Sequence, residues 1–116
     1  MDFMKNYPAD EPVVMLNLLK FKEKSGKGDE SGAAAYKRYS KNVAPMLAKV
    51  GGKLIWSGKP QKTLIGGGET PDMVLLVEYP NKGAFIAMAT SPKYKIVGVD
   101  REMALEYGGL IACKTM

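Results

Sequence analysis

The stretch VVMLNLLKFK, residues 13–22, decides the fold. An apolar run of this length predicts a β-strand over Val13–Phe21, and side chains along a strand alternate between two faces. One face then carries Val13, Met15, Asn17, Leu19 and Phe21, and the other carries Val14, Leu16, Leu18 and Lys20. Both faces are apolar, so both must be covered. Helices of so short a chain can cover one face, and a second copy of the sheet would cover the other, which predicts a homodimer.

Asn17 is the exception in this run, because its amide lies among apolar side chains. A buried amide without partners costs roughly 1–3 kcal/mol, so something should bond it. Its partner could be the neighbouring backbone, which would make it structural. Alternatively, it could face a cleft and orient a carbonyl or enolate oxygen of a ligand. The sequence leaves open whether Asn17 faces helices or the partner sheet.

Composition excludes several classes of chemistry. The 116 residues suit one domain over 1–116, with 46% hydrophobic and 25% charged residues and no histidine. Without imidazole there is no Ser-His-Asp or Cys-His nucleophile, no histidine-ligated haem and no histidine zinc site. Acid–base work falls to Asp, Glu, Tyr, Lys or the substrate itself, and we expect no metal or organic cofactor.

The remaining compositional features predict an ordinary cytoplasmic protein. A single cysteine rules out an internal disulfide, and no apolar run approaches the ~20 residues of a membrane span. Residues 1–10 are expected to be an N-terminal extension without the apolar segment of a signal peptide. The net charge of +5 allows nucleic-acid binding as a weaker alternative. No aromatic pair on a strand accompanies the lysines, so a solvated basic surface is the preferred interpretation.

The rest of the chain is predicted to form helices and further strands in a regular order. A polar, glycine-rich segment at 23–32 predicts a flexible loop, and the following apolar periodicity predicts a helix over 33–50, with a kink or break at Pro45. Further strands are expected at 53–57 with an extension at 63–65, at 72–79 and at 109–114. Asn81 and Ser91 are expected to cap short helices, and residues 101–105 are expected to be helical or a turn. The order β-α-β-β-α-β predicts an α+β, ferredoxin-like fold.

The chain resembles the DUF1330 family over about residues 11–113. The resemblance rests on VVMLNLLKFK, YKRYSKNVAPMLAKVGGKLIWSG, TLIGGG, DMVLLVEYPNKGAFIAMATSPKY and REMALEYGGLIA, in this order. It implies a dimeric α/β barrel, in which two ferredoxin-like sheets pack face to face. The wider superfamily includes cofactor-free monooxygenases, isomerases and histidine-dependent haem enzymes, and the last group is excluded here. Family members often carry histidine where this chain has Asp100, so a histidine-dependent role at that position cannot apply.

Three residues are the candidates for chemistry: Asn17, Tyr39 and Arg101. Tyr39 lies on the apolar stripe of the predicted helix and could supply a hydroxyl near Asn17, or it could simply pack in the core. Arg101 suits a substrate carboxylate, and the alternative is a structural ion pair with Glu78 or Asp72.

Four further residues are candidates for substrate binding: Tyr36, Trp56, Glu78 and Tyr94. Tyr36 shares the helix stripe of Tyr39, and Tyr94 could close the mouth of the same cleft. Trp56 could be core or cleft wall. Glu78 and Asp72 are about 20 Å apart along one strand, so they cannot act as a carboxylate pair, although either alone could be a base.

These observations favour a homodimer with a small apolar cleft in each subunit. One hypothesis is an enzyme without metal or organic cofactor, with oxygenase- or isomerase-like chemistry on a small molecule. The alternative is a binding or structural dimer without catalysis. An open cleft beside Asn17 would favour the first hypothesis, and a fully bonded Asn17 without a cavity would favour the second.

Overall fold

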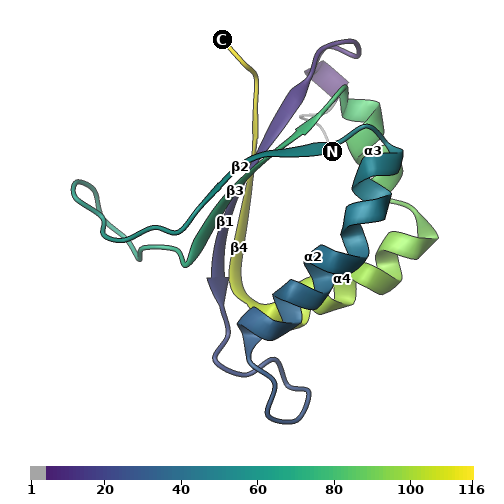
Figure 1. Cartoon of the computed structure of the whole chain (residues 1–116). Coiled ribbons are helices and arrows are strands. Elements are labelled where there is room, and N and C mark those ends of the chain that lie inside the picture. The colour runs from purple at the N-terminus through teal and green to yellow at the C-terminus, as the bar shows by residue number, and fades with distance from the viewer. Residues whose placement is uncertain (1–4) are drawn as a thin grey trace.

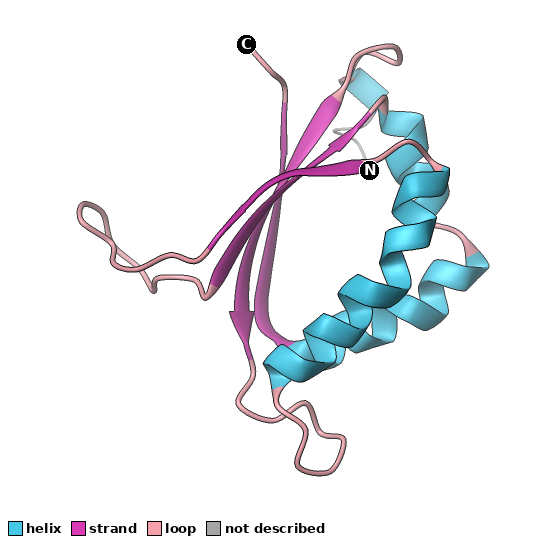
Figure 2. Cartoon of the chain, viewed as in Figure 1, coloured by secondary structure: helices cyan, strands magenta, loops and turns pink. Residues whose placement is uncertain are grey.

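The computed structural model describes residues 5–116 as one antiparallel sheet with helices packed on one of its faces (Figures 1 and 2). The strands lie in the order β2-β3-β1-β4. The elements, in chain order, are β1 (Val13–Phe21), α2 (Gly32–Lys49), β2 (Lys53–Gly58), β3 (Met73–Tyr79), α3 (Lys82–Ala89), α4 (Pro92–Ala104) and β4 (Leu105–Cys113). The ferredoxin-like α+β fold predicted from the sequence is confirmed.

The central strand β1 has the bounds and the two apolar faces that its sequence predicts. It pairs with β3 on one side and with β4 on the other, so all its backbone groups lie inside the sheet. Val13 and Met15 pack in one buried cluster under α2 and α3, and Leu19 packs in a second cluster with Tyr36 and Tyr39 of α2. The face of β1 that carries these odd-numbered residues, and with them Asn17, is therefore the helix-covered face.

Helix α2 begins and ends where local chemistry predicts. The Ser31 hydroxyl accepts a hydrogen bond from the Ala34 backbone N–H at 3.1 Å, which caps the first turn. The chain leaves the helix through Gly51, whose φ of +80° favours glycine. Pro45 lies inside α2 without ending it, so the break that we considered at this position does not occur.

Helices α3 and α4 start at the predicted caps. Asn81 accepts from the Ala84 N–H at 2.8 Å, and Ser91 accepts from the Tyr94 N–H at 3.1 Å with proline next in sequence. Helix α4 then continues to Ala104, which confirms the helical alternative for residues 101–104, while Leu105 already belongs to β4. No proline follows Pro92 within the helix to interrupt it.

Strand β4 begins at Leu105, four residues before the predicted start. Leu105 pairs with Phe21, and the pairing with β1 extends as far as Cys113. The glycine pair at 108–109 lies inside the ladder, because pairing with the central strand outweighs the low strand propensity of glycine.

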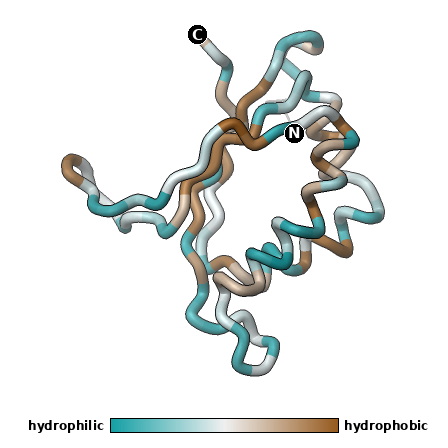
Figure 3. Tube along the Cα trace, in the orientation of Figure 1, coloured by the Kyte–Doolittle hydropathy of each residue, from teal (hydrophilic) through white to brown (hydrophobic). Residues whose placement is uncertain are grey.

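The segment between β2 and β3, residues 59–72, projects from the sheet on the side away from the helices (Figure 1). We call it the arm. The strand predicted at 63–65 is wrong, because nothing in the arm pairs with this segment as a ladder. Instead, Leu64 and Ile65 form an apolar tip that is 86% and 96% exposed (Figure 3).

The 23–32 segment, expected to be flexible, closes on itself through hydrogen bonds. Ser25 is buried, its N–H donates to the Glu30 carbonyl, and its hydroxyl donates to the Glu30 carboxylate at 2.7 Å. Arg38 of α2 then binds both Glu30 and Asp100 of α4. These bonds tie the segment to the two helices that flank it.

The N-terminal extension contributes to the core. Tyr7 is buried in the same cluster as Val13 and Met15, and its hydroxyl donates to the Pro12 carbonyl. Residues 1–4 of the extension lie outside the described part of the chain. Within residues 5–116, no helix is both long enough and apolar enough to cross a bilayer.

None of the helices or loops formed by residues 5–116 covers the face of the sheet opposite the helices. We call it the open face. By strand alternation it carries the apolar residues Leu16, Leu18, Trp56, Val74, Leu76, Tyr107 and Ile111. Trp56, Tyr107 and Ile111 are about half exposed. Such a face in water is unusual for a monomer, because large contiguous apolar patches mark interaction sites.

Candidate functional site

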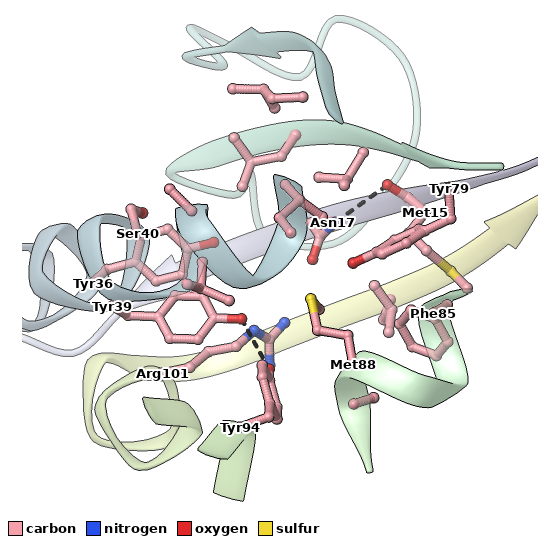
Figure 4. Close-up of a pocket in the computed structure, with 18 residues that line it drawn as sticks. Met15, Asn17, Tyr36, Tyr39, Ser40, Tyr79, Phe85, Met88, Tyr94 and Arg101 are labelled. Carbon is pink, nitrogen blue, oxygen red and sulfur yellow. Dashed lines mark hydrogen bonds between the residues drawn. The ribbon is translucent and has the colours of Figure 1, made fainter. Parts of the chain in front are cut away.

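A cavity of about 270 Å³ lies between the sheet and the three helices (Figure 4). Its wall is mainly apolar, with aliphatic, methionine and phenylalanine side chains from β1, β3, α2 and α3. Five of the seven predicted site residues line it: Asn17, Tyr36, Tyr39, Tyr94 and Arg101. An apolar cavity with a few convergent polar groups is the usual form of a small-molecule site.

Asn17 faces the helices, which settles the question its strand raised. It is buried, and its side-chain Nδ2 donates to the Met15 carbonyl at 3.2 Å. Among residues 5–116, no donor binds the amide oxygen, and Figure 4 shows this oxygen pointing into the cavity. Both interpretations of Asn17 therefore apply: one end of the amide is bonded structurally, and the other end can accept from a ligand.

Tyr39 and Tyr94 link helices α2 and α4 across the cavity. Their hydroxyl oxygens are 2.8 Å apart, and their rings meet edge to face with centroids 6.3 Å apart. Tyr36 stacks on Tyr39 at 5.4 Å. Burial raises the pKa of Tyr36 to about 12 and also raises the pKa of Tyr39, whose neighbour Tyr94 adds to the increase. Both phenols stay protonated near neutral pH and act as hydrogen-bond donors.

Of the described residues that line the cavity, only Arg101 is charged, and Figure 4 shows its guanidinium beside the Tyr39 and Tyr94 hydroxyls. It lies in the last turn of α4. A side chain at Gly108 of β4 would crowd it, because a Cβ there would be 3.2 Å from both terminal guanidinium nitrogens. Glycine at this position therefore lets the arginine lie against the strand.

The predicted ion pairs of Arg101 with Glu78 or Asp72 do not form. Asp72 accepts from the Phe21 N–H at 2.9 Å and pairs with Lys20 instead. Glu78 pairs with Val14 across the ladder, so its side chain is on the open face. Within the described residues, no carboxylate lies at ion-pair distance from Arg101. The guanidinium is therefore available to an anionic ligand.

Trp56 and Glu78 do not belong to this cavity, contrary to the prediction that groups them with the substrate-binding residues. Trp56 pairs with Leu76 and is 54% exposed on the open face, where its ring lies over Gly58. A register shift in β2 between Leu54 and Trp56 helps to place it there. The shift could not be read from the sequence, because no glycine, which marks one common type of bulge, lies between Leu54 and Trp56.

Tyr79 is a cavity residue that the sequence interpretation missed. It is buried, it packs edge to face on Phe85, and burial raises its pKa to about 12. Figure 4 shows its hydroxyl pointing into the cavity. Its face follows from a strand register that the sequence does not contain: Tyr79 pairs with Val13, a residue on the same face of the sheet as Asn17.

The cavity can donate hydrogen bonds and hold negative charge, but it offers no ordinary base. Among the residues that line it there is no Asp, Glu, Lys or Cys, and the pKa values of three of its tyrosines are raised. In the described part of the chain, no three Asp, Glu, Cys or His residues gather as metal ligands would. A reaction in this cavity would therefore use a proton acceptor from the substrate or from water.

The basic surface is partly neutralised by the protein's own carboxylates. Lys20 pairs with Glu69 and Asp72, and Arg38 pairs with Glu30 and Asp100. Hydrogen bonds and charge from Arg38 and Ser25 lower the pKa of Glu30 to about 2, and Arg38 also lowers the pKa of Asp100. Lys20 and Arg38 are thus engaged in ion pairs within the chain, which weakens the hypothesis that the basic surface binds nucleic acid.

Comparison with solved structures supports the same fold. The RPA0582 protein of unknown function from Rhodopseudomonas palustris is 34% identical, with a TM-score of 0.91 over 99% of this chain and 89% of that chain. A dimeric protein of unknown function and ferredoxin-like fold from Bacteroides fragilis is 15% identical, with a TM-score of 0.59 over 93% and 100% of the two chains. A dabb family protein from Mesorhizobium loti is 13% identical, with a TM-score of 0.60 over 90% and 97%.

Among curated proteins, none matches this chain. The family model described as a domain of unknown function, DUF1330, matches residues 29–114, which include α2, β2, β3, α3, α4 and β4. That range contains most of the polar residues of the cavity. The chain therefore belongs to the DUF1330 family.

Proposed function

We propose that the protein is a homodimer in which each subunit binds a small organic carboxylate in the cavity between sheet and helices. One observation carries the proposal: the Arg101 guanidinium lines an otherwise apolar cavity without a carboxylate partner among residues 5–116. A partly desolvated cation is stabilised by an anion, and arginine binds carboxylates with two parallel hydrogen bonds.

The cavity size favours a compact ligand with one ring or a short chain. A volume of about 150 Å³ is enough for benzene, so 270 Å³ holds a substituted ring. Phe85 and Met88 supply apolar wall for such a ring. The amide oxygen of Asn17 and the Tyr79 hydroxyl can bond a second polar group on the ligand.

The homodimer is supported by the surface that one chain leaves exposed. Its accessible surface is 7627 Å², whereas a compact monomer of 12.6 kDa exposes about 6200 Å². The excess of about 1400 Å² is larger than the ~800 Å² that each partner buries in a standard interface. The open face is the apolar part of this excess. A second copy could bury it by packing its own open face against it, since symmetric dimers use the same surface on both subunits.

The binding test compares carboxylates with neutral analogues of the same shape. Calorimetry would measure 4-hydroxybenzoate against 4-hydroxybenzamide, and phenylpyruvate against phenylacetone. Charge-assisted hydrogen bonds contribute about 1.5–3 kcal/mol, so we expect the carboxylates to bind roughly 10- to 150-fold more tightly. Arg101→Gln should remove this preference.

Lys95→Gln is the matched control, because it removes one positive charge from the exposed surface of the same helix, α4. It should leave the binding of both carboxylates unchanged. Equal binding of acids and neutral analogues, or a preference that survives Arg101→Gln, would contradict the proposal. So would dissociation constants above about 1 mM for both carboxylates.

Catalysis without a cofactor is a second candidate, favoured by the convergence of Arg101, Tyr39 and Tyr94 on one region of the cavity. Such donors stabilise negative charge on an enolate oxygen. Phenylpyruvate tests this, because its enol–keto conversion moves a proton between carbon and oxygen through water and changes its ultraviolet absorbance. Conversion that the wild type speeds up and Arg101→Gln does not would support catalysis. Binding without any acceleration would leave a carboxylate-binding protein.

A further inference from the structure

We propose that the arm is a clasp that holds the second copy, with Leu64 and Ile65 at its tip as the anchoring residues. This inference rests on the proposed homodimer and adds to it a contact that the sheet faces alone do not provide. The partner is another copy of this chain, which would bind to the open face and contact the arm at its side.

The tip is built as a contact surface. Leu64 and Ile65 are 86% and 96% exposed, which leaves two branched apolar side chains almost wholly in water. Gly66 and Gly68 follow with φ values of +111° and +91°, a backbone region that favours glycine. The glycines therefore turn the chain directly behind the apolar pair. Burial of such a side chain is among the larger contributions that a single residue makes to association.

The arm is held at its base in a defined direction. Asp72 accepts from the Phe21 N–H at 2.9 Å and lies 3.5 Å from the Lys20 ammonium, which also pairs with Glu69 at 3.2 Å. Further out, the Thr63 and Thr70 hydroxyls are 2.6 Å apart across the two sides of the arm. A pre-positioned arm loses less conformational freedom when it binds than a disordered one.

The direction of the arm points to the partner. Figures 1 and 2 show it leaving the sheet on the side away from the helices, which is the side of the open face. A second copy seated on the open face would therefore meet the arm. The radius of gyration is 14.8 Å, whereas a compact domain of this length has about 13.4 Å. The larger value is consistent with an arm that extends beyond the compact part of the chain.

Area gives an independent reason for the clasp. Four strands spaced at about 4.8 Å and paired over about seven residues present a footprint of roughly 440 Å². A standard interface buries about 800 Å² on each partner. The planar footprint of the sheet is about half of this amount, so contacts outside the sheet would add substantially to the interface. The arm is the projecting element on that side.

A membrane surface is the rival occupant, because Lys59 and Lys62 precede the apolar tip in the chain. The second copy is favoured because a flat bilayer that received the tip would leave the open face of the sheet bare. One double variant distinguishes the second copy from a membrane surface.

The double variant Leu64→Ser/Ile65→Ser removes the apolar tip but keeps the glycine turn, the threonine pair and the charges at the base.

The test measures dimer dissociation by sedimentation velocity over a dilution series. We expect the double variant to dissociate at least tenfold more readily than the wild type, with an unchanged circular dichroism spectrum and unchanged carboxylate binding. Ile96→Ser is the control, since Ile96 is 76% exposed on α4, on the other side of the sheet. It should dimerise like the wild type.

The other outcomes separate the clasp from the dimer. A wild type that is monomeric at about 100 μM would overturn both the clasp and the homodimer. A dimer that the double variant leaves equally stable would overturn the clasp alone. Sedimentation with vesicles of phosphatidylcholine and phosphatidylserine (3:1) that depends on Leu64 and Ile65, with an unchanged dimer, would assign the tip to a membrane surface instead.

Discussion

The two faces of the sheet are made by the same strands and are similarly apolar, yet they have different roles. The helix-covered face includes Asn17 and Tyr79 and borders a cavity that also receives Arg101 from α4. The open face is formed by leucine, isoleucine, valine and aromatic side chains without a comparable polar group at its centre. A face that binds a ligand needs a few polar groups that remain unsatisfied, whereas a face that binds its own copy needs mainly shape and apolar area.

The largest effect is expected from a charge at the centre of the open face. Leu16 lies between Leu76 and Ile111, so Leu16→Asp would place a carboxylate in the proposed interface. A buried charge without a partner costs about 3–5 kcal/mol, which weakens the dimer by about two to four orders of magnitude. Light scattering should then report the mass of a monomer.

Ile96→Asp is the matched control for this change. It introduces the same charge at an exposed apolar residue on the outside of α4 and should leave the dimer intact. A Leu16→Asp protein that keeps the mass of the wild type would show that the open face is not the interface.

The next effect contrasts neighbouring leucines on opposite faces. Leu19 is fully buried under the helices, so Leu19→Ala should lower the free energy of unfolding by about 2–5 kcal/mol at any protein concentration. Leu18 lies on the open face, so the loss caused by Leu18→Ala should grow with protein concentration as the dimer forms. Urea unfolding at two concentrations measures both. If the loss of unfolding free energy caused by Leu18→Ala does not depend on protein concentration, the contrast between the two faces is wrong.

The smallest effect concerns the ion pairs between the 23–32 segment and the helices, where Arg38 joins Glu30 to Asp100. Glu30 has its pKa lowered from 4.5 to about 2, so its stabilising contribution is complete above pH 4.5 and disappears as the pH falls towards 2. Thermal unfolding between pH 6 and pH 2 should show this loss in the wild type. Arg38→Met should show a shallower loss over the same range. Equal slopes would mean that the ion pairs contribute nothing to stability.

Much of the fold followed from local signals. The strand at 13–21, the long helix, and the caps at Asn81 and Ser91 were all predicted from residue type and spacing, because capping and periodicity act over a few residues. The errors have long-range causes. Pairing with Phe21 extended β4 to Leu105, and the lack of any pairing partner kept residues 63–65 out of a strand.

The site was predicted less completely. Tyr36 and Tyr39 could be grouped because they share a helix face, and Asn17 stood out as an amide in an apolar strand. Trp56 could not be placed, since a register shift in β2 decides its face. Arg101 was found by residue type, but its lack of an ion pair depends on Asp72 being bonded to Phe21 and on Glu78 facing away.

The sequence by itself determined the ferredoxin-like order of elements, the two apolar faces of β1, and the exclusion of histidine chemistry. Only the tertiary structure decided that Asn17 faces the helices, that Arg101 reaches the same cavity without a carboxylate partner from residues 5–116, and that residues 64–65 form an exposed tip. The physical reason is the range of the interactions. Alternation and capping are fixed by neighbours in the chain, whereas the choice of face and partner depends on packing between segments far apart in sequence.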